Sequence, residues 1–143
     1  MAINMMGPMQ IIDSALADRC VCLLGTADGK GNPQISPKGS MMVLDANHLA
    51  YWERAGRTAI ENLHENPSVV VFYRNTAKNE KFPNGAVWRF YGKARILTSG
   101  AEWETIWDRT IVAEREKDVD KKGSAVIIEV QRISDLNGRI LQQ

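Results

Sequence analysis

The sequence predicts a mainly β domain, an antiparallel barrel with helices on its outside. Six segments have the composition of β-strands, and most of them are joined by short turns. Parallel neighbours would need long crossover connections, usually helices, after each strand. Helical patterns occur here only at the start, after the third strand and before the last strand. This order is typical of an antiparallel barrel rather than of a doubly wound sheet.

Length and composition favour a single domain spanning residues 1–143. The chain is 44% hydrophobic and 24% charged, and 143 residues are enough to bury a core. Its net charge is +1 and its basic residues form no long run, which argues against a nucleic-acid partner. No apolar run approaches the roughly 20 residues that cross a membrane, and the N-terminus does not resemble a secretory signal. We therefore expect a cytoplasmic protein without a membrane partner.

The two cysteines, Cys20 and Cys22, are expected to be core residues in a reducing compartment. Residues at i and i+2 of a strand share a face and do not form an ordinary disulfide with each other. The two histidines are distant in sequence, so no set of metal ligands is evident and no metal site is expected.

The first elements are a helix and a strand. Pro8 suits the first position of a helix over residues 8–17, which carries an apolar face made of Ile11, Ile12, Ala15 and Leu16. Residues 19–26 follow as a strand that is apolar on both faces and therefore expected to be buried on both sides. Residues 28–33 are rich in Asp, Gly, Asn and Pro and predict a turn.

The next two strands span residues 34–44 and 49–53, with a turn over residues 45–48. Pro37 cannot donate a hydrogen bond to a neighbouring strand, which indicates an edge or a bulge. A helix over residues 57–65 should then end at Asn66-Pro67, because proline disfavours helix in the residue before it.

β-branched and aromatic residues predict a strand over residues 68–74, and a polar loop over 75–85 leads to a long strand over 86–97. The clearest helix spans residues 101–117, with an apolar stripe made of Trp103, Ile106, Trp107 and Ile111. We expect Trp103 and Trp107 to pack in the core or against a second subunit. The last strand covers 124–134, and a polar tail follows it.

The chain between the third strand and the following helix predicts an anion site. The strand breaks at Ala55-Gly56, and the helix then opens on Arg57-Thr58. Free N–H groups and the dipole at a helix N-terminus favour a bound anion, and Arg57 and Thr58 add donors of their own. The alternative is an exposed first helical turn with no ligand.

The order of several motifs resembles one known family. The motifs are Pro33-Gln34-Ile35-Ser36-Pro37, then Tyr51-Trp52-Glu53-Arg54-Ala55-Gly56-Arg57-Thr58, Glu61-Asn62-Leu63, Asn66-Pro67 and finally Val87-Trp88-Arg89-Phe90-Tyr91-Gly92-Lys93-Ala94. From about residue 9 to 136 the chain resembles the pyridoxamine 5′-phosphate oxidase-like FMN-binding split barrels. In its length it resembles the small FMN-binding proteins of that superfamily. The resemblance implies a six-stranded antiparallel split barrel.

The resemblance also implies a homodimer that binds FMN in a groove between its subunits. The phosphate would lie at Arg57 and Thr58, where the sequence independently predicts an anion. The resemblance implies that the flavin ring or ribityl chain contacts Ser36, Pro37, Lys38, Gly39, Trp52 and Glu53. Lys38 would stabilise the reduced ring electrostatically. A simple edge bulge is the alternative interpretation of residues 36–39.

The expected activity is an FMN-dependent oxidoreductase that exchanges electrons or hydride with NAD(P)H or a redox protein. No catalytic side chain is assigned, because the flavin ring itself can accept a hydride. The alternatives are a non-catalytic flavin carrier or sensor, or the same fold holding F420 or haem, the latter with His48 or His64 as axial ligand. Pyridoxal phosphate synthesis is not expected, because the substrate-binding C-terminal extension of the oxidases is not recognised here.

Overall fold

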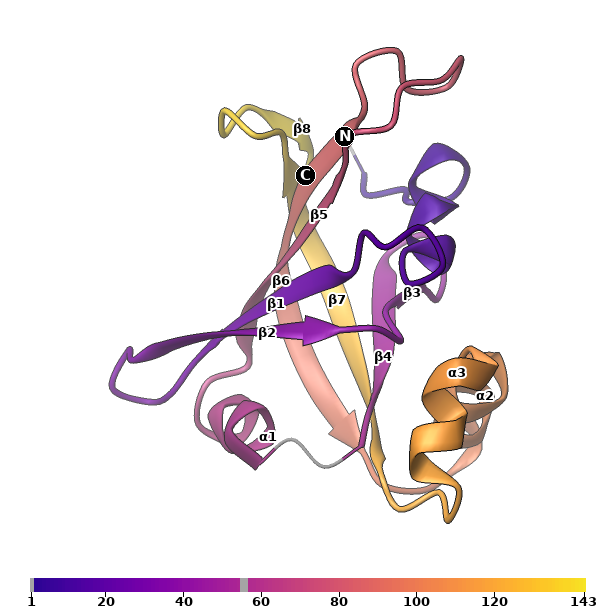
Figure 1. Cartoon of the computed structure of the whole chain (residues 1–143). Helices are drawn as coiled ribbons and strands as arrows, with labels where there is room; N and C mark the ends of the chain where they lie inside the picture. The colour runs from indigo at the N-terminus through magenta and orange to yellow at the C-terminus, as the bar shows by residue number, and fades with distance from the viewer. Residues whose placement is uncertain (1, 55–56) are drawn as a thin grey trace.

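The computed structural model describes residues 2–54 and 57–143, and its strands form one curved antiparallel sheet (Figure 1). The described strands are β1 (Cys22–Ala27), β2 (Pro33–Lys38), β3 (Met42–Val43), β4 (His48–Glu53), β5 (Ser68–Asn75), β6 (Ala86–Leu97), β7 (Ser124–Ser134) and β8 (Ile140–Gln142). The described helices are η1 (Pro8–Ser14), α1 (Arg57–Glu65), α2 (Ala101–Arg109), α3 (Val112–Arg115) and η2 (Glu116–Asp118), of which η1 and η2 are 3-10 helices.

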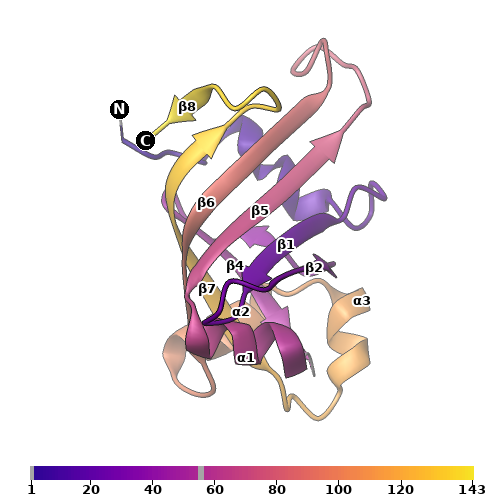
Figure 2. The same ribbon diagram turned by 90° about the vertical axis from the view of Figure 1, so that its left-hand side faces the viewer.

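The sheet curls into a half-barrel flanked by helices, of which η1 and α1 contribute residues to its core (Figures 1 and 2). Its strand order is β2-β1-β5-β6-β7-β4-β3, and β8 pairs with β7. In Figure 2, β5 and β6 run side by side as a long curved hairpin. Mainly β architecture and antiparallel pairing are therefore confirmed.

The expected number of six strands is wrong, since the described residues contain eight. The strand expected over 34–44 is two strands, β2 and β3, because the chain turns between Lys38 and Met42. The polar tail contributes β8, where Ile133 lies opposite Gln142. Pairing with the C-terminal end of β7, beyond the residues that pair with β4, satisfies backbone groups of the tail, although its composition alone predicts a loose segment.

Strand β2 forms one edge of the sheet, as its prolines predict. Strands β3 and β4 lie at the other end of the strand order. The barrel is consequently open between these two edges. We call the place where residues 37–40 approach residues 52–54 the seam.

The core fills the concave side of the sheet. Its fully buried large residues include Tyr51, Tyr73, Phe90, Leu24, Ile128 and Ile133. The expectation that β1 is buried on both faces is wrong, because its exposure alternates and Leu23 is 37% exposed. The helix expected over residues 8–17 is the shorter η1, which buries Met9 and Ile12 against the core.

The long helix expected over 101–117 is divided into α2, α3 and η2. Thr110 has an extended backbone, and its hydroxyl donates a 2.6 Å hydrogen bond to the carbonyl of Ile106. Trp103 and Trp107 pack against Trp52 of β4, so the core alternative for these two tryptophans is correct. The division turns α3 back toward the seam.

Both cysteines are free thiols. Cys22 is fully buried, and burial followed by the nearby Cys20 raises the pKa of its thiol to about 12. No described group of three or more potential ligand residues could hold a metal ion. Of the helices in the described residues, none has the length and hydropathy needed to cross a membrane.

Candidate functional site

A pocket of about 230 Å³ lies at the seam. It is lined by Leu16, Val21, Pro37, Lys38, Gly39, Ser40, Trp52, Glu53, Arg54, Glu114 and Lys117. The pocket thus brings together five residues that the sequence predicts to touch a cofactor: Pro37, Lys38, Gly39, Trp52 and Glu53. They come from β2, from the turn that follows it and from β4.

Two other predicted residues, Ser36 and Thr58, do not line this pocket. Ser36 lies on β2 but outside the lining, and Thr58 is exposed in the first turn of α1. The backbone of Arg57 begins α1, whereas its side chain lies outside the described part of the chain. The predicted strand break at Ala55 and Gly56 also lies outside the described residues.

A buried serine holds the two sides of the seam together. The backbone N–H of Trp52 donates to Ser40 Oγ over 2.9 Å, and the same hydroxyl donates to the carbonyl of Trp52 over 3.1 Å. Ser40 is 5% exposed, so these two bonds are shielded from water. They fix the turn after β2 against the end of β4, which forms the floor of the pocket.

The floor carries a buried ion pair. Lys38 Nζ donates to Glu53 Oε1 over 2.7 Å, and the two side chains are 11% and 8% exposed. Lys38 Nζ also lies 5.4 Å from the ring centroid of Tyr51. Because Glu53 compensates the charge of Lys38, a ligand here meets an ion pair rather than an isolated cation. Sequence reasoning named both residues but not their pairing.

Tyr51 stays protonated beneath the ion pair. Burial, with the negative charge of Glu53 as a second cause, raises the pKa of its hydroxyl far above the usual range. The hydroxyl oxygen is buried and has no hydrogen-bond partner among the described residues. Tyr51 is thus a neutral donor without a described acceptor.

The connection from β6 to β7, which contains α2, α3 and η2, forms the outer wall. The ring of Trp52 lies 4.8 Å from that of Trp107 and 5.3 Å from that of Trp103, measured between centroids. Trp52 Nε1 also donates to Asp118 Oδ2 over 2.8 Å. These contacts hold the connection against β4, and Figure 1 shows α2 and α3 together beside that strand.

Asp118 is ionised at neutral pH. Burial by itself would raise the pKa of its carboxyl, but hydrogen bonds from Trp52 and from the backbone N–H groups of Lys122 and Gly123 outweigh burial and lower it. A lowered pKa stabilises the fold above the unfolded value of about 3.9, and this contribution is lost as the pH falls further. The contacts of Asp118 with the outer wall are therefore intact at neutral pH and weaken in acid.

Glu114 of α3 and Lys117 of η2 complete the wall, and sequence reasoning missed both. The carboxylate of Glu114 lies against Gly39. Residues so far apart in sequence leave no local pattern that would predict this contact. The charge run in which both residues lie is otherwise typical of a solvated helix end.

Helix α1 is anchored on the barrel by its buried face. Ala59 and Leu63 are buried, and Asn62 Nδ2 donates to Thr26 Oγ1 of β1 over 3.0 Å. The helix begins at Arg57, four positions after β4 ends at Glu53, and Arg54, the residue that follows β4, lines the pocket. The N-terminus of α1 is therefore close in sequence to a residue that lines the pocket.

Neither histidine lines the pocket. His48 Nδ1 lies 2.8 Å from Asp45 Oδ1 in the turn before β4, and His64 is exposed on α1. An axial haem ligand at the seam would have to come from another residue type or from another chain.

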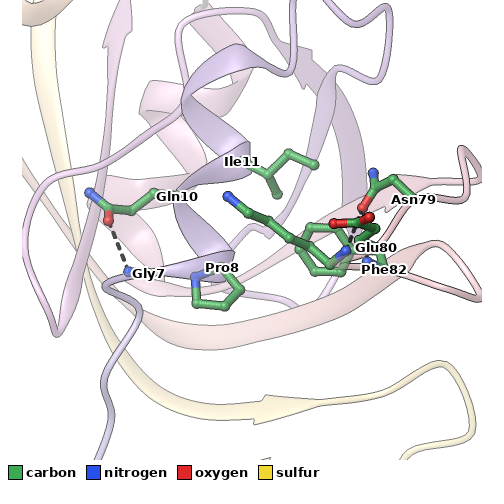
Figure 3. A pocket seen from close by; sticks show the side chains of 8 residues that line it. Gly7, Pro8, Gln10, Ile11, Asn79, Glu80 and Phe82 are labelled. Atoms are coloured by element: carbon green, nitrogen blue, oxygen red, sulfur yellow. Dashed lines mark hydrogen bonds between the residues drawn. The ribbon is translucent and has the colours of Figure 1, made fainter.

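A larger hollow of about 560 Å³ lies elsewhere (Figure 3). It is lined by Gly7, Pro8, Gln10, Ile11, Asn79, Glu80, Lys81 and Phe82. Its visible hydrogen bonds are local, such as the 2.8 Å bond from the N–H of Gly7 to Gln10 Oε1. None of the described side chains predicted to bind a cofactor lines this hollow, so the seam pocket is the better candidate site.

An apolar face lies on the convex side of the sheet, next to the seam. A hollow of about 300 Å³ is lined there by Leu23, Gly25, Ile35, Val70, Phe72 and Arg89. Ile35 is 71% exposed, which is unusual for a large aliphatic side chain on a strand. Pro37, two residues further along β2, lines the seam pocket. The apolar face and the pocket therefore share one strand.

Comparison with known proteins gives a consistent result. A model of the family described as pyridoxamine 5′-phosphate oxidase matches residues 10–137. HupZ from Group A Streptococcus is 26% identical, with a TM-score of 0.67, covering 94% of this chain and 98% of its own. A protein from Lactobacillus delbrueckii, described as a putative pyridoxamine 5′-phosphate oxidase, is 23% identical, with a TM-score of 0.65 and coverages of 90% and 93%.

An FMN-binding protein from Syntrophomonas wolfei has the same fold, with 15% identity, a TM-score of 0.68 and coverages of 87% and 83%. No curated protein matches the chain. The family match covers most of the sequence, and it agrees with the half-barrel described above. The chain belongs to the pyridoxamine 5′-phosphate oxidase family.

Proposed function

We propose that this protein is a cytoplasmic, homodimeric flavoprotein that binds FMN at the seam and exchanges electrons or hydride with a partner such as NAD(P)H or a redox protein. The observation that carries the proposal is the pocket itself. Residues predicted separately on two sides of the barrel, among them Lys38 and Glu53, line one pocket there. The match to the family supports FMN as the ligand.

The proposed roles of the chain are binding and electrostatics. The backbone at Ser36, Pro37 and Gly39 would contact the flavin ring, and Trp52 and Glu53 would flank the ring or the ribityl chain. FMN, when bound, supplies the redox chemistry. The ion pair of Lys38 with Glu53 presents a nearly neutral surface, so we expect Lys38 to influence the ring less than a free cation would.

The absorption spectrum of the purified protein tests the cofactor. Flavin bands near roughly 370 and 450 nm are expected, and their bleaching by NADH or NADPH would support an oxidoreductase. Bound flavin that neither nucleotide reduces would instead favour a carrier or sensor, or a protein electron donor. A Soret band, or the spectrum of a deazaflavin, would contradict FMN.

Arg57→Ala and Thr58→Ala are expected to weaken FMN binding. Each substitution removes a donor from the proposed phosphate site at the start of α1, and for Arg57 the loss should be about 1.5–3 kcal/mol, the value of a hydrogen bond to a charged group. Titration of FMN, followed by its fluorescence, measures the change. Arg74→Ala removes an exposed strand arginine and serves as the control. Unchanged affinity in Arg57→Ala would show that the phosphate binds elsewhere.

Ile35→Glu is expected to convert a dimer into a monomer. The convex apolar face around Leu23, Ile35 and Phe72 suits a second copy of the chain, because it adjoins the pocket through β2. A charge at its most exposed position would have to be buried in the interface, which is strongly unfavourable. Sedimentation velocity measures the change in mass.

Ile140→Glu provides the matched control, because Ile140 is 49% exposed on β8, outside this face. It should leave the oligomeric state unchanged. A wild-type monomer, or an Ile35→Glu variant that remains dimeric, would contradict the use of this face as the interface.

A further inference from the structure

Glu114 presents its carboxylate to the pocket, and no side chain in the described part of the molecule donates a hydrogen bond to it. Its side chain is 8% exposed, and its nearest charged partners are Arg54 Nε at 3.5 Å and Lys117 Nζ at 3.6 Å. Both distances exceed the usual range of about 2.7–3.2 Å for a hydrogen bond from nitrogen to oxygen. Within the described residues, therefore, this carboxylate has loose ion pairs and no short hydrogen bond.

The two cations do not replace such a bond. The side chains of Arg54 and Lys117 are 45% and 51% exposed, so water competes for their donors. The Glu114 oxygens are not among the described buried polar atoms that lack a partner, so the carboxylate keeps contact with water at the open pocket. A donor on a bound molecule would take the place of that water.

The opposite side of the pocket is shaped to accept the carboxylate. A Cβ on residue 39 would overlap Glu114 Oε1 and lie 3.1 Å from its Cδ, so any side chain there would force Glu114 away. Glycine at this position admits the carboxylate directly above the turn that follows β2. This contact shows where the carboxylate stands in the pocket, next to the turn that follows β2.

We infer that Glu114 is a ligand-binding residue, which accepts a hydrogen bond from an O–H or N–H group of the molecule in the pocket. This inference rests on the proposed FMN site. FMN carries such donors in the hydroxyls of its ribityl chain and in the imide N–H of its ring. Its phosphate oxygens are acceptors and are repelled by a carboxylate. Glu114 thereby selects the flavin moiety and directs the phosphate away from α3.

Glu114→Gln separates this role from simple electrostatics. Removing a negative charge should by itself strengthen binding of the FMN dianion. Loss of a charged acceptor should instead weaken FMN and riboflavin alike, by about tenfold, because charge-assisted hydrogen bonds are the stronger ones. Titration of each flavin by fluorescence measures the affinities. Inorganic phosphate, titrated by calorimetry, should bind no more weakly than to the wild type.

Two controls accompany the titrations. Glu116→Gln makes the same change of charge two residues away, where the side chain is exposed, and should leave flavin affinity unchanged. Lumiflavin, which keeps the imide but lacks the ribityl chain, identifies the donor. Weaker lumiflavin binding in Glu114→Gln assigns the imide, and unchanged binding assigns a ribityl hydroxyl.

Several outcomes would overturn the inference. If the wild type binds FMN and Glu114→Gln binds it as tightly or more tightly, Glu114 is not an acceptor for the ligand, while the proposed function stands. If flavin and phosphate affinities fall together with the melting temperature, Glu114 has only a structural role. A wild type that binds no flavin would refute the proposed function, and the role of Glu114 with it.

Discussion

Lys38→Met is expected to lower the free energy of unfolding by about 3–5 kcal/mol, the usual effect of removing one partner from a buried ion pair. The Glu53 side chain would remain 8% exposed and lose the partner that now lies 2.7 Å away. Urea-induced unfolding, followed by tryptophan fluorescence, measures the change. Trp52 lies next to Glu53 in the sequence, so the emission should also report the local disturbance.

The double variant Lys38→Met/Glu53→Leu should recover most of this loss. Replacing both members of a buried ion pair with apolar residues is often neutral or stabilising, because neither charge then has to be desolvated. Lys30→Met, an exposed lysine in the turn before β2, is the control and should change little. A single variant as stable as the wild type would show that water reaches Glu53 and compensates it.

Gly123→Ala is expected to be the second most damaging change, with a loss of about 2–3 kcal/mol from overpacking. The added methyl group would overlap the carbonyl oxygen of Glu53 and lie 2.5 Å from Trp52 Nε1 and 2.9 Å from Asp118 Oδ2. The carbonyl belongs to the backbone and cannot move without displacing the end of β4. Stability in urea and flavin affinity should therefore decrease together.

Gly29→Ala is the matched control for this substitution. The nearest atom to its added methyl group would be Glu65 Oε1 at 3.3 Å, at the end of a flexible side chain. We expect a change of less than about 0.5 kcal/mol, as for most surface positions. If Gly123→Ala is as stable as Gly29→Ala, the close packing between β4 and the start of β7 does not limit stability.

Much of the barrel could be predicted from local patterns. The bounds of α1, β6 and β7 match the expected ranges of residues. β-branched and aromatic residues recur along the two strands, and a proline follows the end of the helix, so local sequence preference and burial agree there. Where the structure differs, a distant contact decides the outcome. Tail residues 140–142 form a strand because they pair with the C-terminal end of β7, which extends beyond β4.

The candidate site could be predicted only in part, for the same reason. Lys38 and Glu53 could each be assigned to a cofactor site from their place in a motif. Their ion pair depends on how closely the two edges of the sheet approach each other, which Ser40 decides through its bonds to Trp52. The position of Glu114 at the pocket depends in addition on the division of the expected long helix at Thr110. No single segment of sequence contains that information.

The origin of the outer wall bears on how such a protein could diversify. The floor of the pocket is formed by the turn after β2 and the end of β4, which are part of the sheet. The outer wall is formed by the connection from β6 to β7, which Trp52, Trp103 and Trp107 hold in place. Residues on that connection can be exchanged or lengthened while the tryptophan anchor keeps it in place. Substitutions in the connection from β6 to β7 could thus change which ligand the pocket prefers without changing the fold of the barrel.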